Sequence, residues 1–168
     1  MILSDTTIKR YIDMGFIGVD PEPTENQIQP ASLDVRFGDE LYDFTTDERR
    51  TSRRHVIEPG VRYLAHTKER IQLPNTTAAQ LAGRSSIGRK GLIIHKTAGW
   101  IDPGFRGEIT LEVFNLGTEP VEIETGERIG QLVFFSLDQP STGYDGHYQD
   151  QSGATQHYVS KTPNRSFD

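Results

Sequence analysis

The chain has 168 residues, a formal net charge of -6 and no cysteine. This length suits one domain with its own core, and the acidic balance argues against nucleic acid as a main partner, because nucleic-acid-binding proteins usually carry a basic face. The missing cysteines exclude disulfides, thiol nucleophiles and cysteine-based zinc sites. No apolar run is long enough for a bilayer and the N-terminus lacks a signal-peptide core, so we expect no membrane partner and a cytoplasmic location.

The N-terminal residues predict a short amphipathic helix. Ser4 is a suitable N-cap, and Gly15 is a suitable residue to end the helix. Three apolar residues fall on one face at i, i+3 and i+4, namely Ile8, Tyr11 and Ile12. Residues 20–26 contain three acids and two prolines and are expected to form a loop.

The next segments predict strands separated by polar excursions. Residues 31–37 alternate between apolar and polar side chains, which predicts a half-buried strand. The apolar face would carry Leu33, Val35 and Phe37, and the other face Ser32, Asp34 and Arg36. Residues 43–54 are almost wholly polar and predict an exposed excursion. A turn at Pro59-Gly60 precedes a strand over residues 61–66.

Residues 83–112 gather glycines, arginines, hydroxyl groups and carboxylates more densely than the rest of the chain. Glycine lets backbone amides approach a ligand closely, and arginine binds phosphate oxygens bidentately. A carboxylate at the end of such a run can act as a general base. This combination suggests a site for a phosphorylated small molecule, although similar loops also occur as ordinary turns on β proteins.

The segment GRSSIGRKG nearly matches a phosphate-binding P-loop but fails it chemically. Four residues separate Gly83 from Gly88, but the next residue is Arg89 instead of lysine. Lys90 is followed by glycine, so the hydroxyl that would bind magnesium is missing. We reject the P-loop and expect a short helix over residues 85–90, which can aim backbone amides at phosphate.

The remaining segments predict further strands and a tail. Residues 92–95 and 121–124 are short strands, and residues 129–137 form an apolar strand in which Gln131 needs a polar partner. Residues 109–114 alternate, which places Glu112 opposite the Ile/Leu/Val face but beside Phe114. From residue 140 the tail lacks a core pattern, so it is either disordered or an arm that orders over something. The class is mainly β, a barrel or sandwich.

Six segments together resemble the dCTP deaminase family, which is related to the trimeric dUTPases. They are IQPASLDVRFG (28–38), GRSSIGR (83–89), HKTAGWIDPGF (95–105), GEITLE (107–112), RIGQLVF (128–134) and HYQDQSGAT (147–155). The resemblance extends over most of the chain, in family order. It implies one domain over residues 1–168: a distorted β-barrel or jelly-roll of the dUTPase-like type, with a short N-terminal helix and a flexible C-terminal arm over about residues 140–168.

The resemblance also implies an activity. The protein would hydrolyse dCTP to release ammonia without a catalytic zinc, coupled to triphosphate cleavage that gives dUMP and pyrophosphate for thymidylate synthesis. The zinc nucleobase deaminases need a His/Cys ligand set that a chain without cysteine does not supply. Magnesium would arrive on the nucleotide triphosphate, with no protein metal site. The family forms homotrimers whose active sites are shared between subunits.

The matching positions give each candidate residue a role. Glu112 resembles the general base, with Arg89, Ser85 and Asp102 as the other catalytic candidates. Thr97 and Ala98 match the backbone that reads the base, and Asp102 lies near the deoxyribose. The substrate-binding candidates are Arg84, Ser85, Ser86, Ile87, Gly88, Arg89, Thr97, Ala98, Asp102, Thr110, Leu111, Glu112, Gln131, Tyr144, His147 and Gln151.

Some positions depart from the family pattern or distinguish its branches. His147 replaces a common lysine, and Asp150 and Ala154 replace the commoner glycine and proline. Gly99-Trp100 stands where monofunctional bacterial enzymes carry His-Arg, which favours the bifunctional, dUMP-forming branch. The alternatives are a monofunctional dCTP deaminase releasing dUTP, a dUTPase without deaminase activity, and a nucleotide-sensing protein without activity.

Overall fold

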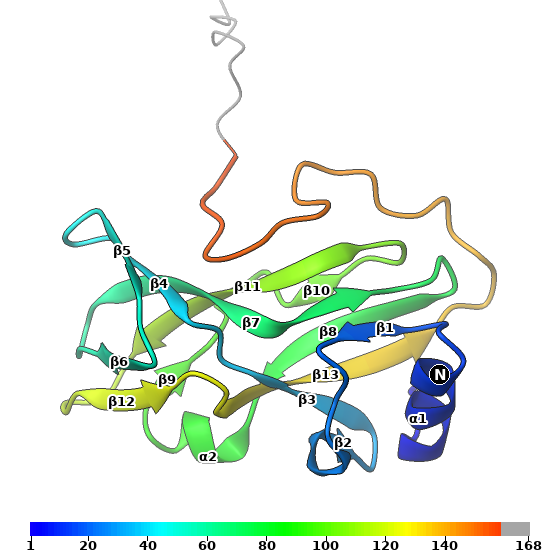
Figure 1. The fold of residues 1–168 in the computed structure, drawn as a ribbon, viewed down its shortest axis with the longest axis horizontal. Helices are drawn as coiled ribbons and strands as arrows, with labels where there is room; N and C mark the ends of the chain where they lie inside the picture. The colour runs from blue at the N-terminus through cyan, green and yellow to red at the C-terminus, as the bar shows by residue number, and fades with distance from the viewer. Residues whose placement is uncertain (159–168) are drawn as a thin grey trace, which may run out of the picture.

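The computed structural model describes residues 1–158 of the chain (Figure 1). Its helical segments are α1 (Asp5–Asp13), the 3₁₀ helix η1 (Glu25–Gln27) and α2 (Ser85–Gly88). Its strands are β1 (Gly18–Asp20), β2 (Ile28–Gln29), β3 (Ser32–Arg36), β4 (Glu40–Asp43), β5 (Glu48–Thr51), β6 (Arg54–Ile57), β7 (Arg62–Gln72), β8 (Thr77–Gly83), β9 (Leu92–Ile93), β10 (Trp100–Ile101), β11 (Arg106–Asn115), β12 (Val121–Glu124) and β13 (Arg128–Ser136). The predicted mainly β class is confirmed.

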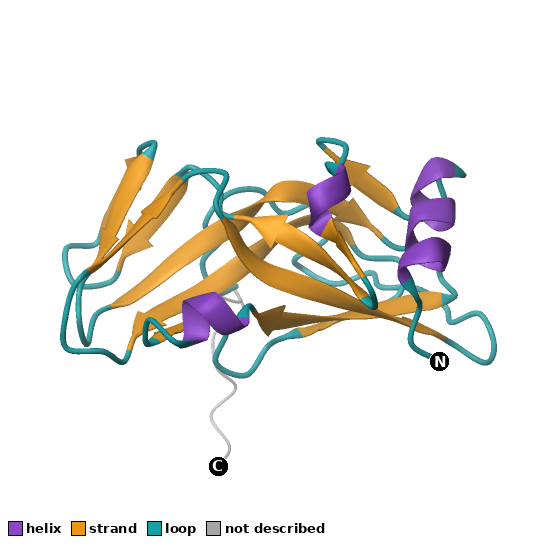
Figure 2. Cartoon of the chain, turned by 90° about the horizontal axis from the view of Figure 1, so that it is seen from below, coloured by secondary structure: helices purple, strands orange, loops and turns teal. Residues whose placement is uncertain are grey.

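Two antiparallel sheets enclose the core. One has the strand order β5-β4-β7-β11-β9 with β1 also paired to β7, the other has the order β10-β8-β13-β3-β2, and β12 pairs with β6 as a separate ribbon. Among the described residues the hydrogen bonding does not close these sheets into a barrel. Large side chains from both sheets fill the space between them, among them Phe37, Leu111 and Phe134. The helical segments lie at the margins of the strands (Figure 2).

The N-terminal helix matches its prediction. Ser4 is the N-cap of α1, and Ile8 is fully buried against the core. The chain leaves the helix through Gly15, whose φ of 72° lies in the left-handed region that favours glycine. The short helix expected within residues 85–90 is also present as α2.

The expectation of a half-buried strand over residues 31–37 is wrong, because β3 is buried on both faces. On its polar face Asp34 is only 1% exposed and Ser32 only 6%. The Asp34 carboxylate pairs with Arg84 and Arg128 at 3.1 and 3.2 Å, and the Ser32 hydroxyl donates to Gln131. These partners cover Asp34 and Ser32 and satisfy their hydrogen-bonding groups.

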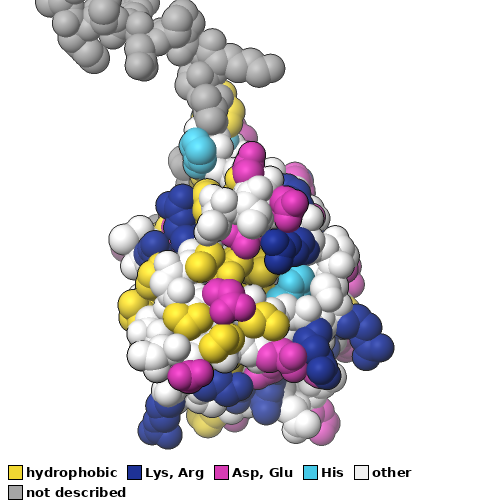
Figure 3. All heavy atoms as spheres, turned by 90° about the vertical axis from the view of Figure 1, so that its left-hand side faces the viewer, with side chains coloured by type: hydrophobic (Ala, Val, Ile, Leu, Met, Phe, Trp, Pro, Cys, Tyr) yellow, Lys and Arg dark blue, Asp and Glu magenta, His cyan; other side chains and the backbone are white. Residues whose placement is uncertain are grey.

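The polar segment is exposed as predicted over residues 45–54, but Asp43 at its start is buried, and the segment contains a strand that the prediction omitted. All four residues of β5 are exposed, and β5 pairs with β4 from Glu40↔Thr51 to Asp43↔Glu48. Backbone pairing and polar side-chain contacts hold this hairpin, among them Arg49 to Glu40 at 2.5 Å and Arg50 to Asp43 at 3.8 Å. Apolar periodicity does not reveal such contacts. At this end of the molecule hydrophobic side chains lie among both acidic and basic ones (Figure 3).

The C-terminal arm runs back across the sheet that contains β7 and β11 (Figure 1). Its backbone forms hydrogen bonds with β11, including Asp150 N to Arg106 O at 2.7 Å and Glu108 N to Gln151 O at 3.0 Å. The arm residues Tyr148 and Gln151 line the same cavity as Glu112, so the arm borders the face of β11 that carries Glu112. Residues 159–168 of the predicted arm lie outside the described residues, and its flexibility stays a prediction.

Candidate active site

A cavity of about 690 Å³ lies between the outer face of β11 and the C-terminal arm. Alternation along β11 buries Leu111 in the core and turns Thr110 and Glu112 toward the cavity. The cavity is lined by Phe44, Arg62, Leu64, Lys96, Ala98, Trp100, Ile101, Asp102, Phe105, Ile109, Thr110, Glu112, Tyr144, Tyr148, Gln151, Thr155, Gln156 and His157. The predicted alternation of residues 109–114 is thus confirmed, and its polar face is a cavity wall.

The Glu112 carboxylate is held by the backbone of the preceding loop. Its Oε2 accepts hydrogen bonds from the amides of Lys96 at 2.8 Å and Thr97 at 3.4 Å. Among the described residues no hydrogen bond reaches Oε1. One oxygen therefore fixes the orientation of the half-buried carboxylate, and the other is free to accept a proton inside the cavity.

The loop before Trp100 depends on a close approach at Gly99. A Cβ atom there would lie 3.0 Å from both the His95 ring and the Leu81 carbonyl oxygen. That spacing is tighter than ordinary van der Waals contact, so a larger residue would push the His95 ring or the β8 backbone aside. Gly99 therefore serves the packing of this loop, whichever product the site forms.

Trp100 lies at the edge of the cavity and contacts Asp102. Its indole Nε1 donates to Asp102 Oδ1 at 3.2 Å, and its ring packs against Phe135 with centroids 5.6 Å apart. The side chain is 54% exposed. Both residues line the cavity that contains Glu112.

Two buried polar atoms near the cavity have no hydrogen-bond partner among the described residues. They are Thr110 Oγ1 and His95 Nδ1. Such groups are rare in folded proteins, because an unsatisfied buried donor or acceptor costs free energy. Thr110 lies two residues from Glu112 on the same strand face, so one of these groups belongs to the cavity wall.

A second cavity of about 370 Å³ contains another part of the predicted site. Its lining residues are Gln29, Pro30, Ser32, Asp34, Arg84, Ser85, Ser86 and Gln131. Arg84 is held there by Asp34 at its Nε and by the Arg128 carbonyl oxygen at its Nη1. Burial raises the pKa of Asp34, against the opposing attraction of Arg84 and then Arg128.

The structure therefore divides the predicted site residues between two cavities of one chain. Glu112, Asp102, Ala98 and the arm residues Tyr144 and Gln151 line the larger cavity. The predicted residues of the smaller cavity are Arg84, Ser85, Ser86 and Gln131. Gln131 thus lies in a different cavity of the chain from Tyr144 and Gln151.

Several candidates line neither cavity. Ile87 and Leu111 are buried core residues, which leaves only their backbone for a ligand. Gly88 and Arg89 lie exposed at the end of α2. His147 stacks on Tyr158 with ring centroids 3.7 Å apart. Thr97 is exposed and contributes its amide to Glu112.

Several residues of the larger cavity have no signal in the sequence. Phe44 and Arg62 form one wall, where the Arg62 guanidinium lies 3.6 Å from the Phe44 ring centroid. Tyr148 and Gln156 contribute from the arm. Their presence depends on the pairing of β4 with β7 and on the attachment of the arm to β11, and no local pattern in the sequence encodes these long-range contacts.

The described residues contain no group of three or more His, Asp or Glu side chains placed to hold a metal ion. None of the helices in residues 1–158 combines the length and the apolar character that crossing a membrane requires.

Comparison with known proteins adds a family likeness. A family model described as dCTP deaminase-like matches residues 2–137. The "dCTP deaminase, dUMP-forming" of Methanosphaera stadtmanae is 42% identical and the match covers 95% of this chain and 93% of that protein. The protein of the same name from Methanothermobacter thermautotrophicus is 43% identical over 87% and 84% of the two chains. The "dCTP deaminase" of Natronomonas pharaonis is 40% identical over 91% and 92%.

Solved structures support the same fold. The 2'-deoxycytidine 5'-triphosphate deaminase of Agrobacterium tumefaciens superposes with a TM-score of 0.70 at 24% identity, over 79% of this chain and 47% of that chain. A dUTPase from Staphylococcus aureus phage phi11, which coordinates a structural Mg(II) ion, gives a TM-score of 0.54 at 19% identity, over 79% and 97%. At these identities the likeness concerns the fold alone.

Proposed function

The chain belongs to the dCTP deaminase-like family, and from this premise we propose that it hydrolyses dCTP to ammonia, dUMP and pyrophosphate. The observation that carries the proposal is the Glu112 carboxylate, fixed through one oxygen on the wall of a cavity that also contains Trp100 and Asp102. The product would supply dUMP for thymidylate synthesis, and we assign the enzyme to the cytoplasm on that ground.

Glu112 is the general base of the deamination. It takes a proton from water as the water oxygen attacks the amino-bearing carbon of the cytosine ring. The carbon–nitrogen bond then breaks, and the Glu112 carboxyl group returns the proton to the departing ammonia. The amides of Lys96 and Thr97 support this role because they orient the carboxylate without occupying Oε1. General acid–base catalysis of this kind contributes roughly 10²–10⁴-fold to a rate.

A second subunit completes the site in this proposal. Ser85, Arg84 and Gln131 bind the phosphates or position water, but in one chain they line a different cavity from Glu112. A homotrimer brings the small cavity of one copy to the large cavity of the next, and Arg89, exposed beside α2, enters the same junction. Closed cyclic symmetry repeats such a junction identically at every interface.

Magnesium belongs to the substrate in this proposal. The triphosphate carries it, because Mg²⁺ prefers phosphate oxygens and water to a cage made wholly of protein ligands. Arg84 places a positive charge beside the same phosphates, and the ion pair with Asp34 keeps the Arg84 guanidinium in one orientation.

The coupled step depends on Asp102 and Trp100. Asp102 orients a second water molecule toward the α-phosphate, so that the bond to the departing pyrophosphate breaks and dUMP remains. Such a reaction needs positioning and electrostatic stabilisation more than covalent chemistry by the protein. The hydrogen bond from Trp100 supports the role, because it restricts the Asp102 carboxylate at the cavity edge.

A monofunctional dCTP deaminase that releases dUTP is the second candidate. Relatives from Natronomonas pharaonis and Halorubrum lacusprofundi, 40% and 36% identical, carry the name dCTP deaminase without the dUMP-forming addition. A dUTPase without deaminase activity is the weaker alternative, because these relatives are named as deaminases.

A single-turnover assay with dCTP and magnesium tests the proposal. We expect one pyrophosphate per ammonia, with dUMP as the nucleotide product. Ammonia accompanied by an equal amount of dUTP would support the monofunctional candidate. In a parallel assay with dUTP, pyrophosphate release by a chain that gives no ammonia from dCTP would overturn the deaminase assignment.

A further inference from the structure

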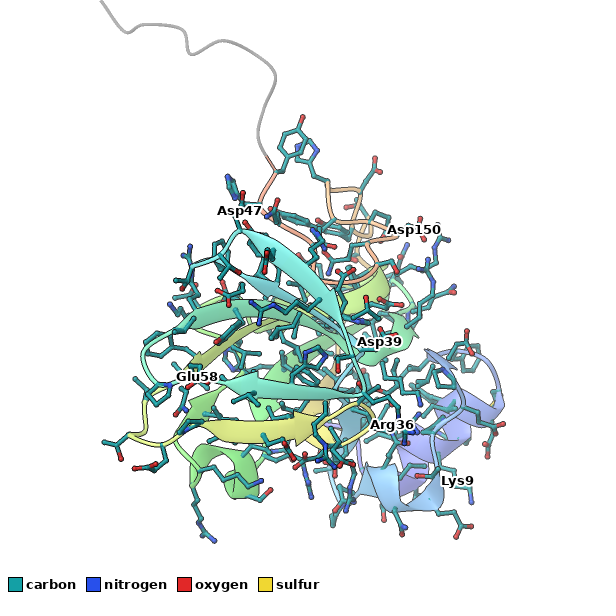
Figure 4. All side chains as sticks on the ribbon, turned by 60° about the vertical axis from the view of Figure 1, so that its left-hand side comes forward. Lys9, Arg36, Asp39, Asp47, Glu58 and Asp150 are labelled. Atoms are coloured by element: carbon teal, nitrogen blue, oxygen red, sulfur yellow. The ribbon has the colours of Figure 1, made fainter. Side chains whose placement is uncertain are left out.

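The carboxylate of Asp150 joins the arm to two strands of the sheet. Arg106 of β11 donates from Nε and Nη2 at 2.5 Å each, and Arg70 of β7 donates from Nη2. Figure 4 labels Asp150 on the arm above these strands. The bidentate Arg106 contact has the geometry in which arginine binds carboxylates most strongly. We call Asp150, Arg106 and Arg70 the arm clamp.

The backbone at the arm clamp is in a conformation that favours glycine. Asp150 has a φ of 61°, one of two non-glycine residues with positive φ among the described residues. An aspartate in this region is tolerated at a modest cost that glycine avoids. The backbone at this position favours glycine, and the ion pairs with the two arginines offset the cost of an aspartate there. The hydrogen bonds from Arg106 and then Arg70 lower the pKa of Asp150 to about 2, so the carboxylate stays charged at neutral pH.

The arm lies close against β11 around the clamp. Gln151 exchanges two hydrogen bonds with Glu108, from Glu108 N to Gln151 O at 3.0 Å and from Gln151 Nε2 to Glu108 O at 2.8 Å. A Cβ atom on Gly107 would lie 3.1 Å from the Gln151 carbonyl oxygen. This approach leaves little space between strand and arm.

A second attachment lies beyond the clamp. The Glu108 carboxylate accepts from the Gly153 amide at 2.6 Å and the Ser152 hydroxyl at 3.2 Å. Ala154 is fully buried against Tyr42 and Leu64. The arm clamp is therefore one of two successive anchors, and it is the one nearer to the cavity-lining residues Tyr148 and Gln151.

We propose that Asp150 is a positioning residue, whose ion pairs with Arg106 and Arg70 hold the arm so that Tyr148 and Gln151 form a wall of the Glu112 cavity and retain the nucleotide. Tyr148 and Gln151 flank Asp150 in the chain, and both line that cavity. Release of the clamp leaves Ala154 docked but loosens the cavity wall. The part of this inference that concerns nucleotide retention rests on the proposed dCTP reaction; the part that concerns the arm does not.

The test compares Asp150→Asn, Asp150→Gly and Arg106→Gln with the wild-type chain, and uses Asp145→Asn as the matched control. Asp145 is an exposed arm residue that forms no ion pair with the described residues. Amide hydrogen exchange over residues 149–153 reports the arm directly. We expect exchange to rise about 3- to 10-fold in the three clamp variants, because exposed ion pairs contribute modestly and the second anchor remains.

Steady-state kinetics with dCTP supply the second readout. The KM of the clamp variants should rise by a similar factor with kcat nearly unchanged, and Asp145→Asn should match the wild type. Salt at about 0.5 M should raise the wild-type KM more than that of Asp150→Asn, because it screens a charge pair that the variant lacks.

Asp150→Gly decides between the clamp and the backbone alone, because glycine keeps the positive φ without the charge. Wild-type exchange in this variant would overturn the clamp. Faster exchange with an unchanged KM would overturn its role in nucleotide retention. If the clamp variants exchange faster but the wild-type protein does not deaminate dCTP, the positioning of the arm is supported and the proposed function is refuted.

Discussion

The indole nitrogen of Trp100 donates a hydrogen bond to Asp102 over 3.2 Å, and this contact ties the only tryptophan of the chain to a carboxylate at the rim of the cavity. A lone tryptophan is most often a core residue, yet Trp100 is 54% exposed. The ring and the carboxylate therefore act as a pair that shapes this rim.

Trp100→Phe should separate the coupled step from deamination. Phenylalanine keeps an aromatic ring against Phe135 but removes the donor to Asp102. We expect pyrophosphate per ammonia in a single turnover to fall well below one, because a lost hydrogen bond to a charged group costs about 1.5–3 kcal/mol. Ammonia release should change by less than about 3-fold, because the substitution leaves Glu112 and its amide partners untouched. An unchanged ratio would show that Trp100 has no part in the coupling.

Glu112→Gln should abolish deamination and leave the fold intact. The glutamine carbonyl oxygen can still accept from the Lys96 and Thr97 amides, but an amide is no base. Ammonia release should fall roughly 10²–10⁴-fold, with the melting temperature nearly unchanged. Glu122→Gln is the matched control, since Glu122 is exposed on β12 and pairs only with Arg54 among the described residues. Ammonia release within 10-fold of the control would argue against Glu112 as the base.

Local patterns predicted the elements well, because they depend on neighbours in the sequence. The spacing of Ile8, Tyr11 and Ile12 predicted α1, and the alternation through Thr110 and Glu112 predicted the polar face of β11. The resemblance named some residues of each cavity and implied sites shared between subunits, but it did not name Phe44 or Arg62 in the larger cavity. The arm clamp and the burial of Asp34 come from partners far along the chain, which periodicity does not encode.

Asp34→Asn should weaken nucleotide binding without destabilising the fold at neutral pH. Burial raises the pKa of Asp34 above its ordinary value of 3.8, so the folded state binds the proton more tightly than the unfolded chain. Protonation of Asp34 therefore stabilises the wild-type fold below about pH 4, and this stabilisation is lost as pH rises through the raised pKa. Arg84 and Arg128 are 28% and 37% exposed at their side chains, so water can solvate them once the carboxylate is gone.

Urea unfolding at pH 4.5 and pH 7, together with the KM for dCTP, checks this prediction. The free energy of unfolding of Asp34→Asn should equal or exceed that of the wild type by up to about 1 kcal/mol at pH 7. Its KM should rise about 3- to 10-fold, because Arg84 loses a charged hydrogen-bond partner that orients it. A loss of several kcal/mol at pH 7 would instead show that the ion pairs stabilise the fold.

Mixing two inactive variants should restore activity if neighbouring subunits share each site. Glu112 and Ser85 lie in different cavities of one chain, so Glu112→Gln damages one side of a shared site and Ser85→Ala the other. Light scattering should first give a particle of about three times the 18.9 kDa chain mass for each variant. After joint unfolding and refolding at equal amounts, about one quarter of the sites should combine an intact Glu112 with an intact Ser85 from the adjacent copy.

Ammonia release should therefore recover to about one quarter of the wild-type rate, whereas either variant refolded alone stays inactive. Each chain of the mixture carries one of the two substitutions, so a site built within a single chain has no route to recovery. Trimeric mixtures without regained activity would place Glu112 and Ser85 in the same subunit's site, or show that Ser85 is dispensable if its own variant remained active.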